Sequence, residues 1–80
     1  MTVLDFAPTT RTRDGVVTVQ LHDDLWRVTR DDGEVLGYVD RATTPAGERF
    51  SARRMLTRQR RFIPVGEFWR FADAMDCFRF

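Results

Sequence analysis

The sequence predicts an α+β domain, in which an antiparallel meander of four or five strands carries one C-terminal helix packed on one face. Two patterns lead to this expectation. Between residues 16 and 65, short segments of strand-like composition are separated by turns rich in Asp, Gly, Thr and Pro. From Phe71 onward, apolar residues instead recur with the period of a helix. We expect a flexible N-terminal arm over 1–14 and a single domain over 15–80.

The arm and the first predicted strand differ in their patterning. Residues 1–14 show no sustained period, and Asp14-Gly15 is a turn signal. Residues 16–22 alternate, which is typical of a strand with one buried face. The side chains expected on the core face are those of Val17, Val19 and Leu21.

A β-hairpin is predicted where residues 25–30 and 35–41 flank Asp31-Asp32-Gly33-Glu34. A two-residue turn would place Trp26 and Val28 on one face with Gly37 and Val39. A three-residue turn with a left-handed Gly33 would instead pair Val28 with Leu36 and Trp26 with Tyr38. The second register places four large apolar side chains on one face and Arg27 on the other. We favour this register because the four apolar side chains can then be buried together.

The C-terminal half is expected to add two strands and the helix. Residues 48–56 form a strand with Phe50, Ala52 and Leu56 on the core face and Arg49, Ser51 and Arg53 on the other. Residues 61–65 form an edge strand, because Pro64 has no amide hydrogen to donate. The helix runs from about residue 71 to 79, and its buried stripe consists of Phe71, Ala74, Met75 and Phe78.

Composition limits the class of protein. The chain is 42% apolar and 31% charged, as globular domains are. A single cysteine, Cys77, excludes an internal disulfide. The N-terminus lacks the apolar segment of a signal peptide and no long apolar run follows, so we expect a cytoplasmic protein with no membrane partner.

An arginine cluster is the feature that points beyond folding. All thirteen basic residues are arginine, and six of them fall between residues 49 and 61. Guanidinium groups match phosphate and carboxylate oxygens in a bidentate manner, so an anionic partner is indicated. The predicted nucleic-acid contacts are Arg27, Arg49, Arg53, Arg58, Arg60 and Arg61. The alternative is a solvated strand face whose arginines pair with Glu48, Asp40 and the turn aspartates.

No group of residues predicts catalysis or metal binding. His22 is the only histidine and lies far from Cys77, whereas a zinc site needs three or four ligands. Ser51 has no neighbouring base, and Asp76 disfavours the thiolate of Cys77. We therefore expect a protein that is not an enzyme, with no cofactor, no metal and no evident small-molecule substrate.

Aromatic residues near the C-terminus suggest an interface. A helix of about two turns cannot cover all of them, and exposed aromatic side chains mark protein contacts. Trp69 and Phe80 are the candidate interface residues. They favour a small protein-interaction module that binds a protein partner or forms a homodimer. The alternative for Phe80 is that it folds back over the sheet edge.

Two resemblances accompany these patterns. The hairpin residues Trp26, Val28, Gly33 and Leu36-Gly37-Tyr38, with the segments 66–69 and 73–74, resemble a group of short uncharacterised proteins of high-GC Gram-positive bacteria. This resemblance spans residues 25–80 and brings no established activity.

Trp26, Leu36-Gly37, Phe50, Ala52 and Ala74 are also similar to the AP2-like modules at the front of tyrosine integrases. Arginines on the exposed sheet face of those modules enter the major groove of DNA, so the resemblance implies nucleic-acid binding through Arg27, Arg49 and Arg53. The strand at 16–22, the fifth strand and the acids Asp23, Asp31, Asp32 and Asp40 depart from that pattern.

Overall fold

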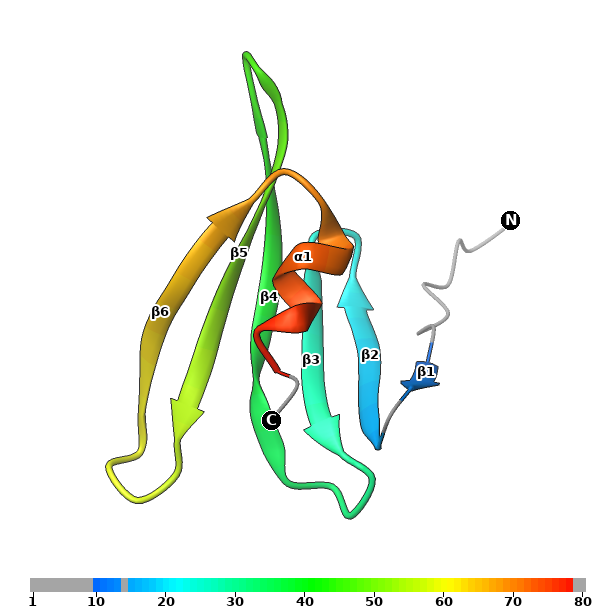
Figure 1. Cartoon of the computed structure of the whole chain (residues 1–80), viewed down its shortest axis with the longest axis vertical. Helices are drawn as coiled ribbons and strands as arrows, with labels where there is room; N and C mark the ends of the chain where they lie inside the picture. Colours follow the sequence, from blue (N-terminus) through cyan, green and yellow to red (C-terminus); the bar gives the residue numbers. More distant parts are fainter. Residues whose placement is uncertain (1–9, 14, 79–80) are drawn as a thin grey trace, which may run out of the picture.

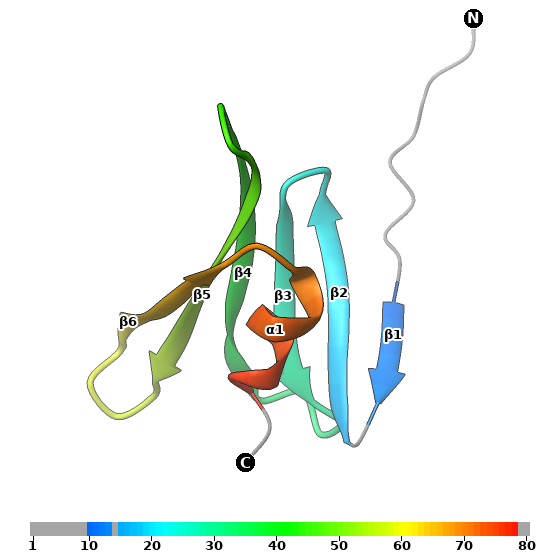
Figure 2. The same ribbon diagram turned by 45° about the horizontal axis from the view of Figure 1, so that its top comes forward.

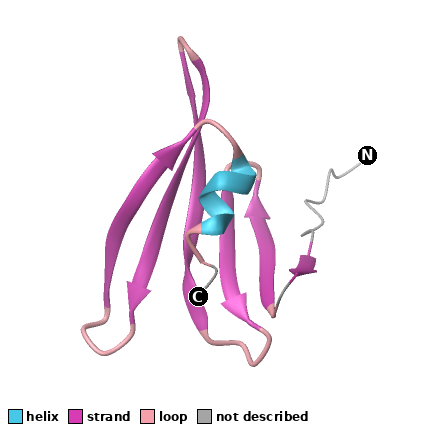
Figure 3. Ribbon diagram, viewed as in Figure 1, coloured by secondary structure: helices cyan, strands magenta, loops and turns pink. Residues whose placement is uncertain are grey.

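One antiparallel sheet and one helix make up the structure, a computed structural model that describes residues 10–13 and 15–78 (Figure 1). Each strand pairs with the strand before it in sequence, so the order is β1-β2-β3-β4-β5-β6. The strands are β1 (Thr10–Arg13), β2 (Val16–His22), β3 (Leu25–Arg30), β4 (Val35–Thr44), β5 (Gly47–Leu56) and β6 (Arg61–Phe68). The helix α1 (Phe71–Asp76) lies across one face of the sheet (Figure 3).

The α+β meander is confirmed, but it has six strands rather than four or five. The sixth is β1, which lies within the segment expected to be an arm. Thr10 pairs with Val19 and Arg13 with Val16. The strand was missed because its sequence, Thr-Arg-Thr-Arg, has no apolar alternation and forms through backbone pairing. Residues 1–9 lie outside the described part of the chain.

The turn of the β3–β4 hairpin is the expected three-residue turn. The Arg30 amide donates to the Glu34 carbonyl oxygen at 2.8 Å, and the Gly33 amide donates to the Arg30 carbonyl oxygen at 3.0 Å. Gly33 has a φ of 93°, as this turn requires. The turn chemistry predicted from the sequence is therefore correct.

The register expected beyond that turn is wrong. Thr29 pairs with Val35, but Val28 then pairs with Gly37 and Trp26 with Val39. A bulge at Leu36 adds one residue to β4, and one extra residue exchanges the two faces of a strand. Tyr38 therefore lies opposite Arg27, on the face away from the helix.

The expected orientation of β2 is also wrong. Gln20 pairs with Trp26, whose ring lies 4.9 Å from that of Phe71 at the start of α1. Thr18 shares this helix side, and its hydroxyl lies 3.8 Å from the sulfur of Met75. Val17 and Val19 therefore face the other side, where they are half-buried, and Leu21 is the extra residue of a bulge between Gln20 and His22. Apolar alternation alone could not tell which face of β2 the helix covers.

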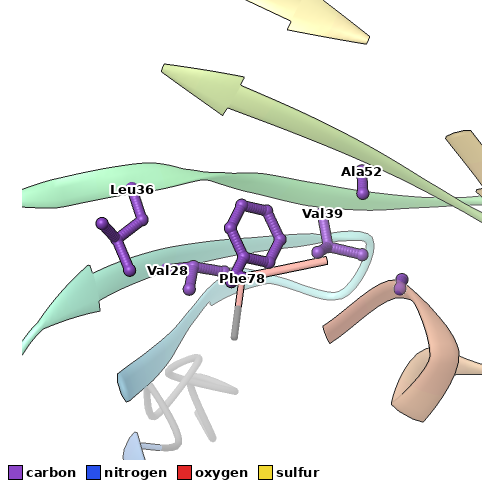
Figure 4. Packing of buried hydrophobic residues seen from close by; sticks show 6 residues of the cluster. Val28, Leu36, Val39, Ala52 and Phe78 are labelled. Carbon is purple, nitrogen blue, oxygen red and sulfur yellow. The ribbon is translucent and has the colours of Figure 1, made fainter. Parts of the chain in front are cut away.

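The core lies between α1 and the middle of the sheet (Figure 4). Its buried members come from three strands and the C-terminal segment: Val28, Leu36, Val39, Ala52, Ala74 and Phe78. The helix itself is shorter than expected and ends at Asp76. Turn hydrogen bonds from the amides of Cys77 and Phe78 still carry the Phe78 ring into the core, so the predicted stripe does face the sheet.

Only one face of the sheet has a second layer. Among the described residues, α1 is the only element outside the sheet, and it packs on the side shown toward the viewer in Figure 2. We call the opposite side of the sheet the outer face. Residues on it must remain compatible with water or with a partner, because no element of the described chain covers them.

Candidate functional site

Two arginines and a tyrosine form a row across the outer face. Arg27 on β3 pairs with Tyr38 on β4, and Tyr38 pairs with Arg53 on β5. Directly opposed residues in an antiparallel sheet point to the same side, so these three side chains stand next to each other. Arg49, four residues before Arg53 on β5, projects from the same face. The structure thus brings together the three arginines that the sequence places on the exposed sheet face.

The three arginines share an unusual feature at Nε. In Arg27, Arg49 and Arg53, the Nε atom is buried and has no hydrogen-bond partner in the described structure. Their side chains nevertheless reach the surface, with Arg49 38% and Arg53 41% exposed. A buried donor without a partner is costly, so each Nε is a polar group that the fold leaves unsatisfied. Because Nε is shielded from solvent, a phosphate or carboxylate would contact the exposed ends of the Arg49 and Arg53 side chains.

Aromatic rings contact two of these guanidinium groups, those of Arg49 and Arg53. The Arg49 Cζ atom lies 4.4 Å from the centre of the Trp69 ring. The Arg53 Cζ atom lies 5.9 Å from the Tyr38 ring centre and 5.8 Å from that of Phe62. Tyr38 and Phe62 in turn contact each other edge to face, with ring centres 5.4 Å apart. Such contacts orient a guanidinium group while leaving its edge available for an anion.

Carboxylates on the outer face pair only loosely with these arginines. Arg53 lies 3.5 Å from Asp40 and Arg49 lies 3.7 Å from Glu67, longer than a charge-assisted hydrogen bond. The alternative, a solvated strand face with paired arginines, therefore describes Arg53, which lies near Asp40. Glu48, however, contacts Arg41 on the helix side of the sheet. Arg27 has no carboxylate partner within residues 10–13 and 15–78.

The β5–β6 turn extends the positive charge beyond the face. Arg58, Arg60 and Arg61 are all exposed there, at the lower end of the sheet in Figure 1. None of the three forms an ion pair with a described residue. Arg60 adopts a φ of 51°, a left-handed conformation that is uncommon for arginine. Phe62, which follows directly on the outer face, is 42% exposed.

Sequence reasoning missed two contributors to this surface. Tyr38 was placed in the core by the wrong hairpin register, and Phe62 was not singled out. A period-two reading of β6 could have found Phe62, because it faces Met55 on the arginine side of β5. Trp69, predicted as an interface residue, is 53% exposed. Phe80, the other predicted interface residue, lies outside the described residues.

Arg41 forms a separate cluster on the helix side. Its Nε donates to Asp24 at 3.0 Å, and a terminal nitrogen donates to the Asp23 carbonyl oxygen at 2.7 Å. The hydrogen bond to Asp24, with further attraction from Glu48, raises the pKa of Arg41 against the opposing effect of burial. This arginine ties the β2–β3 turn to β4 and has its charge balanced within the chain. Its role is structural. The sequence alone does not indicate the Arg41–Asp24 pair, because the two residues are 17 positions apart.

An open pocket of about 340 Å³ lies beside this cluster. Its walls include the rings of Trp26, Phe50 and Phe71, with Arg11 and Arg41 at its margin. Trp26 and Phe50 lie 6.2 Å apart between ring centres, and both contact Phe71. These contacts anchor the start of α1 to β3 and β5, so the rings already serve the packing of the helix.

The remaining chemical candidates have ordinary structural surroundings. His22 is exposed, and its Nδ1 accepts a hydrogen bond from the Asp24 amide in the β2–β3 turn. Burial, with the charge of Asp76 as a smaller cause, raises the pKa of the Cys77 thiol, which lowers its reactivity. In the part of the chain that the structure describes, no three His, Cys, Asp or Glu residues gather as metal ligands would. In the same part, no helix is both long and apolar enough to cross a membrane.

Comparison with known protein families, with curated proteins and with solved structures finds no match for this chain.

Proposed function

We propose that this protein is a non-catalytic module that binds nucleic acid through the outer face of its sheet. The observation that carries the proposal is the row of Arg27, Tyr38 and Arg53 across three neighbouring strands. Arginine and aromatic side chains that alternate on a sheet supply the two contacts a nucleic acid needs, one for phosphates and one for sugars or bases.

The local charge supports this proposal even though the chain as a whole carries only +1. Three arginines on the outer face, Arg27, Arg49 and Arg53, are joined by three at the β5–β6 turn, Arg58, Arg60 and Arg61. The carboxylates that face them from the strands are Asp40 and Glu67. Both ion pairs are long and more than a third exposed, so an incoming phosphate can replace either carboxylate at little cost.

The β6 edge of the sheet is less suited to binding a partner than the outer face is. The β6 edge contains Pro64, which cannot donate a hydrogen bond to an added strand. A bulge between Gly66 and Pro64 also leaves Val65 without a partner on β5. Proline and bulges are the features by which edge strands resist pairing with other chains. These features favour recognition through outer-face side chains over recognition by strand addition.

The experiment that tests the proposal is a binding titration with fluorescently labelled oligonucleotides at low salt. The test variant combines Arg49→Ala with Arg53→Ala. Its matched control combines Arg11→Ala with Arg30→Ala, which removes the same charge from β1 and from the end of β3. We expect the test variant to lose affinity and the control to retain it. Equal losses in both variants, or no binding of the native protein at tens of micromolar, would refute the proposal.

A second candidate function is association with a protein partner or with a second copy of the chain. The observation that favours it is that the large apolar side chains most exposed among the described residues lie on β6 or directly after it: Phe62, Val65 and Trp69. Exposed aromatic side chains in one region are typical of protein interfaces. Sedimentation of the native protein, with and without oligonucleotide, separates this function from the first.

A further inference from the structure

Two exposed rings mark the ends of the arginine-bearing part of the outer face. Phe62 lies near the start of β6 and Trp69 directly follows its end, and they are 42% and 53% exposed. Six residues lie between them, one of them the bulged Val65, which corresponds to a span of roughly 20 Å at the usual rise per residue. Each ring has its own arginine, because Arg53 lies over Phe62 and Arg49 over Trp69.

The two rings differ in how much of their surface the protein already uses. Phe62 contacts Tyr38 edge to face and also receives Arg53. Trp69 receives the Arg49 guanidinium group on one side, and half of its surface is still exposed. This exposed surface leaves room for a planar group to stack on Trp69 while its phosphate contacts Arg49.

Whether the nucleic acid is single- or double-stranded follows from which of its surfaces such rings can contact. In a duplex the base faces are stacked on one another, so a flat aromatic platform has only the sugar–phosphate backbone to contact. In a single strand the base faces are free, and stacking of a base on an aromatic side chain strengthens binding by roughly 5- to 150-fold per ring. Arginines that alternate with exposed rings therefore match a single strand better than a duplex.

We propose that the outer face binds single-stranded nucleic acid, with one base stacked on Trp69 and the adjoining phosphates held by Arg49 and Arg53. This inference rests on the proposed nucleic-acid binding and specifies its substrate class. Phe62 offers a second stacking position further along the strand, beside the arginines of the β5–β6 turn. Stacking does not depend on base identity, so binding is tolerant of sequence.

The test compares four labelled probes of equal length. They are a 12-nucleotide DNA strand, the same sequence as RNA, the DNA duplex, and a DNA backbone that lacks its bases. We expect the two single strands to bind at least severalfold more tightly than either the duplex or the base-free strand. The DNA and RNA probes show which single strand is preferred. Duplex binding as tight as single-strand binding would overturn the inference while leaving nucleic-acid binding intact, and failure of all four probes would remove the proposed function itself.

Variants of Trp69 make the test specific to stacking. Trp69→Ala should weaken binding of the single strands about tenfold and leave binding of the base-free strand unchanged. Trp69→Phe, which keeps an aromatic face, should restore most of the affinity. Thermal melts of both variants show whether the fold is retained; if Trp69→Ala melts early, Phe62→Ala replaces it. An equal loss for strands with and without bases would show that the ring only positions Arg49, and would overturn the inference.

Discussion

The ring of Phe78 packs directly over Gly37, where β4 carries no side chain. A Cβ atom at Gly37 would lie 2.7 Å from Cε1 of Phe78, and it would overlap the backbone carbonyl oxygen of Arg53. Gly37 thus provides the gap into which the last described residue of the chain inserts. This contact joins the C-terminal segment to the centre of the sheet, opposite the arginine row.

The first prediction concerns this contact. Gly37→Ala should lower the free energy of unfolding by about 1–3 kcal/mol, because one of the two clashing groups is backbone and cannot move aside. For a domain of this size, each kcal/mol lowers the melting midpoint by about 4–8 °C. Urea and thermal denaturation measure the change. Gly66→Ala is the matched control, because its new Cβ would meet only the Phe68 side chain, at 3.1 Å. Equal stabilities for the two variants would contradict the packing.

The second prediction concerns the β3–β4 turn. Gly33→Val should lower the free energy of unfolding by at least about 1 kcal/mol through backbone strain, since the residue has a φ of 93°. No atom lies within 4 Å of the added Cβ, so steric overlap does not contribute. Gly33→Asn should lose less, because asparagine tolerates positive φ better than a β-branched residue does. Equal denaturation midpoints for the native protein and the valine variant would contradict a strained position.

The third prediction concerns the salt dependence of nucleic-acid binding. Each phosphate contact contributes about −0.9 to the slope of log affinity against log salt for a duplex, and about −0.7 for a single strand. If Arg49 and Arg53 each hold one phosphate, the double variant to alanine should flatten the slope by roughly 1.4 for a single strand. Titrations at four or more salt concentrations measure this slope. An unchanged slope would show that these two arginines do not contact phosphates, whatever the affinity at one salt concentration.

Features of this fold that depend on neighbouring residues could be predicted from the sequence, whereas features that depend on contacts between distant segments could not. The β3–β4 turn could be predicted because its conformation depends on Gly33 and its immediate neighbours. The pairing beyond it could not, because the bulge at Leu36 depends on how that side chain fits beside Val28 in the assembled core. Hydrophobic partition within one hairpin favours burying Tyr38, whereas Phe78 packs over Gly37 in the core that contains Val39.

In the candidate site too, some features follow from the local sequence and others depend on contacts between distant segments. The outward projection of Arg49 and Arg53 follows from the alternation of β5, which is a local property. Their contacts with Trp69, Tyr38 and Phe62 depend on strand registers that no single segment encodes. The aromatic half of the site therefore emerged only once the six strands were assembled.

The fourth prediction separates the two aromatic residues near the C-terminus. Phe78 is fully buried, so Phe78→Ala should lower the free energy of unfolding by about 3–5 kcal/mol, a large share of the total for a small domain. Thermal denaturation measures this loss, which is expected with or without association.

Deletion of Phe80 tests the protein-association hypothesis. If Phe80 belongs to an interface, its deletion should reduce self-association in sedimentation while leaving the melting midpoint of the dilute protein unchanged. Trp69→Ala should act in the same direction, since its ring is 53% exposed. A fold-back of Phe80 over the sheet edge would instead lower the melting midpoint by several degrees. A native protein that sediments as a monomer at high concentration, combined with that lowered midpoint, would exclude a self-association role for Phe80.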